Sequence, residues 1–402
     1  MKTNQWTLGL AAAGLVTLPA GLCADEPQLH PVQSAVQSTT LSGYVNASMH
    51  WNLGTGNANN PAYSYGSGKA DGFNLDAVNL TLQKPLDEAS WAAGYTVDLL
   101  FGPDANAYAT SSVLGANDSD FAIKQANVVL RAPVGNGLDF KVGVFDTIIG
   151  YEVFHAGNNP NYTRSYGFTI EPTTHTGVLM TYQVCEGFSA SAGVANTTGA
   201  AINERAFGNT GNNNKAESYK TYMGSVTFTA PESLGFLGGS VLYAGIVNGF
   251  GPSALGSSGE GAVNTSYYVG ATVNTPVEAL KVGAAFDYYN VDDQNLATDI
   301  NSGWAWSAAG YVSYQLSEKL KLHGRGEYFS QTDSWAVSGL PDKVISGTAT
   351  LDYSLWANAL TRLEFRWDHS AGDFGVAYGE NSVGAADLKN AYLVALNVIY
   401  SF

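Results

Sequence analysis

The segment Arg362-Leu363-Glu364-Phe365-Arg366-Trp367-Asp368 alternates strictly between charged and apolar side chains. Residues 351–355 (LDYSL) repeat the same two-residue period a few positions earlier. Successive side chains of a β-strand point to opposite faces, so this period predicts strands with one apolar face and one polar face.

The alternation recurs throughout the chain, and no stretch after residue 24 has the roughly 18 apolar residues that a membrane-spanning helix needs. Charged residues make up only 13% of the chain, against about 25% in soluble domains. A bilayer accepts only helices or closed barrels. The sequence therefore predicts an all-β fold, a transmembrane antiparallel β-barrel of about 16 strands. The predicted strands are residues 41–52, 73–85, 91–101, 120–132, 138–146, 168–183, 187–196, 218–230, 236–248, 264–275, 279–291, 303–316, 319–331, 343–355, 358–369 and 388–402.

Short and long connections alternate between these strands, which predicts short periplasmic turns and long extracellular loops, with both chain ends in the periplasm. The N-terminal region begins with Lys2, continues as an apolar run and has the small residue Ala24 before Asp25. This pattern predicts a signal peptide at 1–24. A short periplasmic leader at 25–40 and the barrel domain at 41–402 would follow.

The last predicted strand ends on an aromatic residue. Tyr400 and Phe402 share the apolar face of that strand, whereas Asn397 and Ser401 share the other face. This ending resembles the terminal strand read by the outer-membrane insertion machinery, so we interpret Tyr400 and Phe402 as the assembly signal. The alternative is an ordinary edge strand of a soluble protein.

Three stretches carry a resemblance to a known family: residues 142–152 (VGVFDTIIGYE), 161–165 (NYTRS) and 171–178 (EPTTHTGV). Together they look like the OmpL-like outer-membrane β-barrel porin family of Gram-negative-type bacteria. The resemblance implies a channel in the cell outer membrane. It implies no particular solute and no catalytic residue.

The connection after residue 146 is the third external loop of the predicted topology. Its first residues, Ile148 and Ile149, are apolar and would be poorly placed in bulk water, but they could pack on the inner wall of the barrel. We therefore expect the loop to fold inward and narrow the pore. The alternative is an external loop packed over the barrel mouth. The charged candidates for the constriction are Glu152, His155, Arg164 and Glu171.

Charged residues share the polar face of two later strands and would line the opposite wall of the pore. A charge on the lipid face costs ~2–4 kcal/mol near the bilayer midplane, so these side chains must point inward. Arginines facing an acidic loop would create a transverse field, whereas mutual salt bridges would only stiffen the wall. The candidates are Lys321, His323, Arg325, Glu327, Arg362, Glu364 and Arg366.

These patterns predict a porin, a water-filled channel for passive diffusion of small hydrophilic solutes or ions. The net charge of -16 excludes nucleic acid as a main partner and predicts a weak preference for cations. One alternative is a structural or adhesive barrel with a plugged lumen and partner-binding loops. The other is an enzyme, disfavoured because no HExxH or GxSxG motif occurs. No cofactor or metal is expected.

The expected partners are outer-membrane lipids, the insertion machinery and the solutes themselves. A homotrimer is a further possibility, because small residues recur on the outward face of two adjacent predicted strands, where a second copy could approach closely. These residues are Gly324, Gly326, Gly347 and Ala349.

Overall fold

The computed structural model describes residues 38–54, 69–108, 120–206, 218–251, 262–292, 302–332, 340–372, 378 and 388–402. The predicted signal peptide at 1–24, and the predicted leader as far as residue 37, lie outside the described residues.

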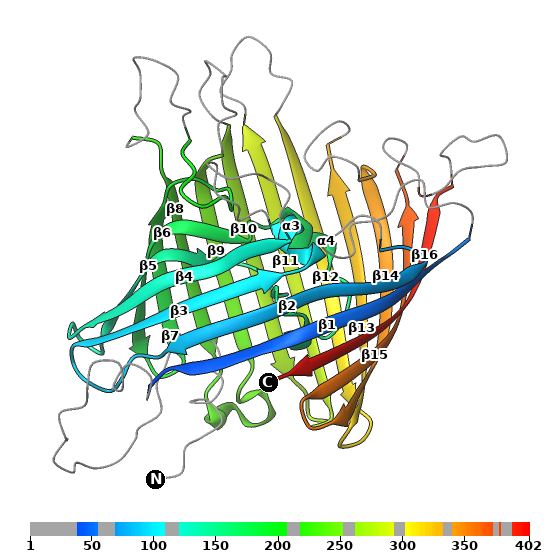
Figure 1. The fold of residues 1–402 in the computed structure, drawn as a ribbon, viewed down its shortest axis with the longest axis horizontal. Helices are drawn as coiled ribbons and strands as arrows, with labels where there is room; N and C mark the ends of the chain where they lie inside the picture. The colour runs from blue at the N-terminus through cyan, green and yellow to red at the C-terminus, as the bar shows by residue number, and fades with distance from the viewer. Residues whose placement is uncertain are drawn as a thin grey trace.

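Sixteen antiparallel strands form one closed barrel, which confirms the predicted fold (Figure 1). Each strand pairs with its neighbours in sequence, and β1 pairs with β16 to close the ring. The strands are β1 (Thr40–Leu53), β2 (Gly72–Lys84), β3 (Ala92–Phe101), β4 (Phe121–Ala132), β5 (Leu138–Asp146), β6 (Thr174–Cys185), β7 (Phe188–Ala195), β8 (Thr221–Thr229), β9 (Val241–Phe250), β10 (Val263–Asn274), β11 (Leu280–Asp292), β12 (Gly303–Gln315), β13 (Leu320–Gln331), β14 (Lys343–Trp356), β15 (Ala359–Ser370) and β16 (Asn390–Ser401).

The two ends of the barrel differ in their connections. Short turns join the strands at one end, and the described parts of the long connections lie at the other (Figure 1). The C-terminal end of β16 lies at the short-turn end (Figure 1). The described parts of the long connections include two short α-helices, α3 (Pro103–Tyr108) and α4 (Tyr166–Ile170).

Two predicted strand boundaries are wrong. The predicted strand at 168–183 begins only at Thr174, because α4 occupies its first positions; the Ser165 hydroxyl accepts a hydrogen bond from the Phe168 amide and caps that helix. The predicted strand at 236–248 begins only at Val241, because a 3₁₀ helix (η2, Glu232–Leu237) follows Pro231. In both places a short helix interrupts what alternation alone describes as a strand.

Strand β15 shows how the alternation becomes two faces of one wall. Its charged residues are almost completely buried; Arg362, for example, is 1% exposed. Its apolar residues face outward, and Leu363 is 50% exposed. A surface of this kind suits hydrocarbon rather than water. None of the helices in the described part of the chain has the length and apolar character to cross a membrane.

The barrel is closed by the last residues of the chain. The Phe402 amide donates to the Gly43 carbonyl, and the Gly43 amide donates to the Phe402 carbonyl, each over 2.9 Å. Tyr400 and Phe402 lie on the outward face and are about half exposed. The two predicted assembly residues thus stand at the seam between β16 and β1.

Candidate functional site

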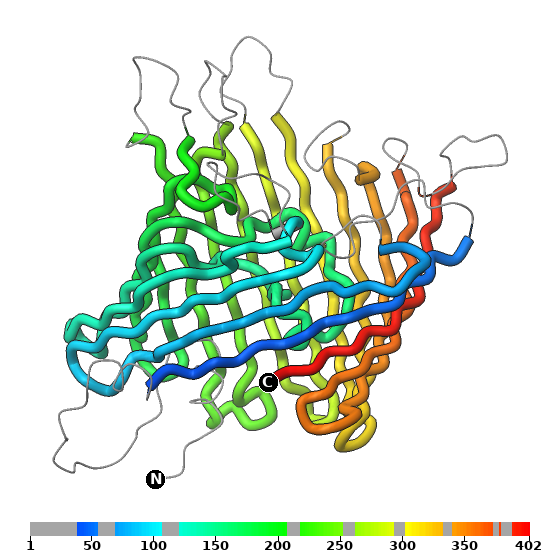
Figure 2. The backbone as a smooth tube through the Cα atoms, in the orientation of Figure 1, coloured from blue at the N-terminus to red at the C-terminus, as the bar shows by residue number. Residues whose placement is uncertain are grey.

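The connection between β5 and β6, residues 147–173, lies inside the ring of strands (Figure 2). We call it the inner segment. A hydrogen bond of 3.0 Å from the Thr147 amide to the Thr173 carbonyl closes its neck. Residues 161–167 are all buried. The alternative position, over the barrel mouth, does not fit this burial.

The first part of the inner segment packs on an apolar wall. Ile149 is buried in a cluster with inward side chains of several strands, and Ile148 and Tyr151 pack against that cluster. Tyr151 stacks on Tyr311 of β12, with ring centroids 4.1 Å apart. The strand residues of this cluster are Phe145, Leu179, Ala195, Met223, Val247, Tyr268, Ala285, Ala309 and Tyr311. Apolar burial therefore fixes the start of the segment.

The next part meets the charged wall of β13–β15. The Glu152 carboxylate accepts a hydrogen bond from Arg325 over 2.8 Å, as a buried ion pair. Arg325 also contacts Glu327 on its own strand at 3.1 Å. The same guanidinium donates to the Thr163 carbonyl over 2.7 Å. Arg325 thus holds the segment at two separate points.

Arginine side chains of β15 also hold the segment, by hydrogen bonds to the backbone carbonyls of the segment. Arg366 donates to the Arg164 carbonyl over 2.5 Å and pairs with Asp368 at 2.9 Å. Arg362 donates to the Ala156 and Asn159 carbonyls over 2.9 and 3.0 Å. Charged donors of this kind form the stronger class of hydrogen bonds.

Glu364 supplies the complementary acceptors. Its carboxylate accepts from the Tyr162 amide over 2.7 Å and from the Thr163 amide over 2.9 Å. Glu327 likewise accepts from the Tyr166 amide over 2.7 Å. The predicted pore-wall residues Arg325, Glu327, Arg362, Glu364 and Arg366 are therefore buried beneath the segment and bind it instead of facing water.

The remaining predicted loop residues have separate environments. Arg164 donates to the Tyr162 and Phe154 carbonyls and so folds the segment onto itself. His155 packs on Tyr44 of β1 with ring centroids 4.1 Å apart, and burial lowers its pKa to about 4. Burial raises the pKa of Glu171 well above its ordinary value, and the neighbouring Asp287 carboxylate, which shares a hydrogen bond with it, raises it further.

Sequence reasoning missed a second anchor on the opposite side of the lumen. The Tyr162 hydroxyl donates to Asp76 of β2 over 3.0 Å and contacts His50 of β1 at 2.8 Å. Asp76 also pairs with Lys69 at 2.6 Å. His50 and Asp76 are inward polar residues, so strand parity could have identified them as lumen residues. Their partner, Tyr162, carries no such signal, because it lies outside any strand.

Lys321 and His323 differ from the other wall candidates, because they lie closer to the short turns. With Lys281 of β11 and Asp352 of β14, they line a cavity of about 280 Å³ below the inner segment. His323 contacts the Ser313 hydroxyl at 2.7 Å. These are the predicted wall residues that border open space in the lumen.

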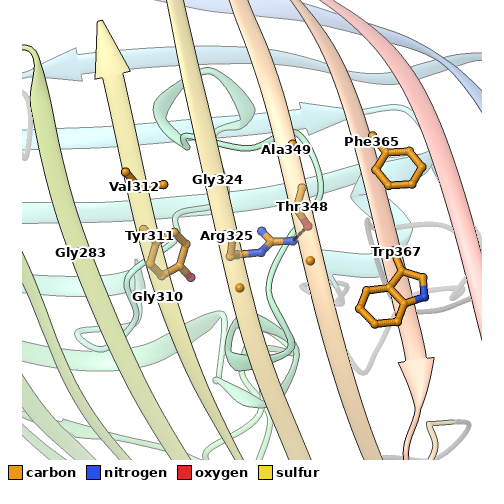
Figure 3. Close-up of a pocket in the computed structure, with 12 residues that line it drawn as sticks. Gly283, Gly310, Tyr311, Val312, Gly324, Arg325, Thr348, Ala349, Phe365 and Trp367 are labelled. Carbon is orange, nitrogen blue, oxygen red and sulfur yellow. Dashed lines mark hydrogen bonds between the residues drawn. The ribbon is translucent and has the colours of Figure 1, made fainter.

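The outer face of the same wall has a shallow depression of about 580 Å³. Figure 3 shows this wall from outside, with Tyr311, Arg325 and Thr348 on one side of it and Phe365 and Trp367 on the other. The depression exists because small residues face outward on adjacent strands. These include Gly310, Gly324, Gly326, Gly347 and Ala349.

Within the described ranges, no group of three or more His, Cys, Asp or Glu side chains is arranged to hold a metal ion. Cys185 is free and exposed.

A closed antiparallel barrel with an apolar exterior defines the class of outer-membrane β-barrels. Three solved structures share this fold. The channel DcaP of Acinetobacter baumannii matches with a TM-score of 0.57 and 12% identity, over 90% of this chain and 97% of that chain. OmpT of Vibrio cholerae, in its trimer form, matches with a TM-score of 0.57 and 12% identity, over 90% of this chain and 99% of that chain. An anion-selective porin from Comamonas acidovorans matches with a TM-score of 0.56 and 14% identity, over 91% of this chain and 99% of that chain.

The chain belongs to the family described as "Putative beta-barrel porin-2, OmpL-like", whose model matches residues 38–402. This confirms the resemblance carried by residues 142–178. The chain is thus an outer-membrane porin, as the alternation and turn pattern predict.

Proposed function

We propose that the inner segment forms the constriction of a water-filled channel, through which small hydrophilic solutes diffuse passively down their own gradients. One observation carries the proposal. The segment is bonded to one wall, β13–β15, by buried charged side chains that reach its backbone. Such bonds fix a loop at constant position inside a wide barrel, which is what a selective constriction requires. The proposal includes no catalytic step and no cofactor.

The test is the single-channel conductance of the refolded chain in a planar bilayer. We expect stable steps for the wild type. Removing one anchor in Glu152→Gln/Arg325→Gln should give larger or noisier steps, because the segment loses its bond to β13. The matched control is Glu318→Gln/Lys319→Gln in an exposed short turn, which should leave the steps unchanged.

The plugged, adhesive barrel remains a second candidate, and a specific observation favours it. The inner segment contacts the wall on several sides, at β5–β12, at β1–β4, at β12–β14 and at β16. A folded, heat-modifiable barrel that stays silent in the bilayer would support this candidate and contradict the channel.

We also propose that the chain is exported by the signal peptide at 1–24, with a short leader at 25–40, and is inserted through recognition of Tyr400 and Phe402. The outward position of both rings at the β16–β1 seam supports this role. Deleting Phe402 should lower the fraction of heat-modifiable barrel recovered from outer membranes. Deletion of the exposed residue Gly54, which follows the end of β1 in a long connection, serves as the control.

We further propose that the porin forms a homotrimer. The depression over Gly324, Gly326, Gly347 and Ala349 would let a second copy approach β13 and β14 closely. The trimer form of the similar Vibrio cholerae protein supports this assembly state. Native mass spectrometry should report a trimer for the wild type and a smaller species for Gly326→Trp, whose added side chain would point out of the depression.

A further inference from the structure

The cavity below the inner segment has basic side chains on its wall. Its roof includes residues 157–160 of the segment, and its wall comes from β10–β14. Lys281 and Lys321 both line it, together with Ser313 and His323. The cavity holds about 280 Å³, which is room for a small solute with some of its water.

Strand register explains why these side chains gather. Lys281 lies opposite Ser313 on β12, and Ser313 lies opposite His323 on β13. Lys321, two residues before His323, lies opposite Asp352 on β14. Alternation points all of them to the lumen. Two lysines therefore face one space from strands that have β12 between them.

Neither lysine is neutralised within the described part of the chain. Lys281 and Lys321 form no ion pair and no side-chain hydrogen bond with a described residue. The one carboxylate in the lining, Asp352, already has partners, with Arg362 at 3.4 Å and His323 at 3.9 Å. Glu152, also in the lumen, pairs with Arg325 and does not line the cavity. Among the residues that line the cavity, the charges without an ion-pair partner are those of Lys281 and Lys321.

We propose that this lysine cavity binds small hydrophilic anions, carrying carboxylate or phosphate groups, as they pass through the channel. The inference rests on the proposed channel function and adds its solute class. Lys281 and Lys321 supply the charge, while Ser313 and Asn158 supply neutral hydrogen-bonding groups. The channel then prefers anions, which reverses the preference for cations that the net charge of -16 predicts.

The acidic residues of the short turns do not cancel this effect. Glu278 and Glu318, for example, are exposed to bulk solvent at the rim of the barrel. Salt screens such charges over about 8–10 Å. Lys281 and Lys321 are also exposed, but they line the cavity whereas Glu278 and Glu318 do not, so the lysines lie closer to an ion inside it. Local charge, and not the total, therefore sets the selectivity.

The test is the reversal potential in a potassium chloride gradient. We expect a chloride-to-potassium permeability ratio above 1 for the wild type, and a drop of about twofold or more in Lys281→Gln/Lys321→Gln. The control is Lys343→Gln, which also replaces a lysine by glutamine, but at an exposed position at the other end of β14. It should leave the permeability ratio unchanged. A cation-selective wild type, or a ratio unaffected by the double variant, would overturn the inference.

A second measurement does not depend on conduction. Inorganic phosphate added to the refolded barrel should show ³¹P line broadening that is lost in Lys281→Gln/Lys321→Gln and kept in Lys343→Gln; citrate should compete with it. A silent wild type that still broadens phosphate would contradict the open channel while keeping the anion site. Equal ³¹P line broadening in all three proteins would contradict the proposed anion site, whatever conductance the wild type shows.

Discussion

Two of the walls that hold the inner segment use opposite chemistry. The wall formed by β5–β12 meets Ile148, Ile149 and Tyr151 with apolar side chains. The wall formed by β13–β15 meets the backbone of residues 156–166 with arginine and glutamate side chains. The first contact needs only burial, but the second needs matched donors and acceptors. Inward charge on a barrel strand is therefore no proof of a water-lined wall.

The largest effect is expected on the charged wall. Replacing Arg366 in Arg366→Ala leaves Asp368 buried without its cation and removes one of the two cations beside Glu327. Breaking a buried charged pair in this way costs about 3–5 kcal/mol. The loss of stability is measured by urea unfolding in lipid vesicles, with the folded fraction at each urea concentration detected as the heat-modifiable band on a gel. Lys343→Ala, at an exposed position, is the control. Equal midpoints for both variants would mean that the ion pairs do not stabilise the barrel.

The apolar wall should respond more locally. Ile149 is 6% exposed, so Ile149→Ala removes buried contacts worth about 2–5 kcal/mol. Because these contacts fix one part of the segment, the expected readout is more frequent conductance transitions. Val153→Ala is the matched control in the same segment, since Val153 is 47% exposed. Similar transition rates in the two variants would contradict the packing role of Ile149.

A smaller effect is expected for Glu364→Gln. The amide can still accept a hydrogen bond from Tyr162 or Thr163, but the bonds lose their charge. The expected loss is about 1–2 kcal/mol, because charge-assisted bonds are roughly twice as strong as neutral ones. An unfolding midpoint between those of the wild type and Arg366→Ala would fit. Glu318→Gln, in an exposed turn, controls for the loss of one charge.

The smallest effect is that of pH on Glu171. Its pKa is raised by burial in the folded state, so its contribution to stability is fully present below the ordinary carboxyl pKa and is lost as the pH rises through the folded value. Ionised Glu171 then repels Asp287. Channel noise should increase from pH 5 to pH 9 in the wild type and stay flat in Glu171→Gln. A variant with the same pH profile as the wild type would exclude Glu171 as the titrating group.

The barrel could be predicted from the sequence, because strands with outward apolar side chains, as at Leu363 and Phe365, can span a bilayer only as a closed barrel. The prediction failed at Thr174 and Val241, where short helices follow Ser165 and Pro231. In those places a local cap or turn outweighs the alternation.

The site was only partly predictable. Glu152 and Arg325 could be assigned to facing surfaces, and the structure brings them together. The role of Glu364 could not be foreseen, since its partners are backbone amides of Tyr162 and Thr163 whose positions depend on the whole fold of the segment. The cation preference drawn from the total charge stays a prediction, which the reversal potential tests against the proposed anion preference.

The central claim is that the inner segment lies bonded against the charged wall while the channel conducts. Asn161 of the segment donates to the Thr350 hydroxyl of β14 over 2.7 Å, so Asn161→Cys/Thr350→Cys in a Cys185→Ser background joins the two. The account predicts that the disulfide forms spontaneously and that single-channel conductance is the same before and after reduction. Failure to form the disulfide, or a conductance that changes when it is reduced, would contradict the claim.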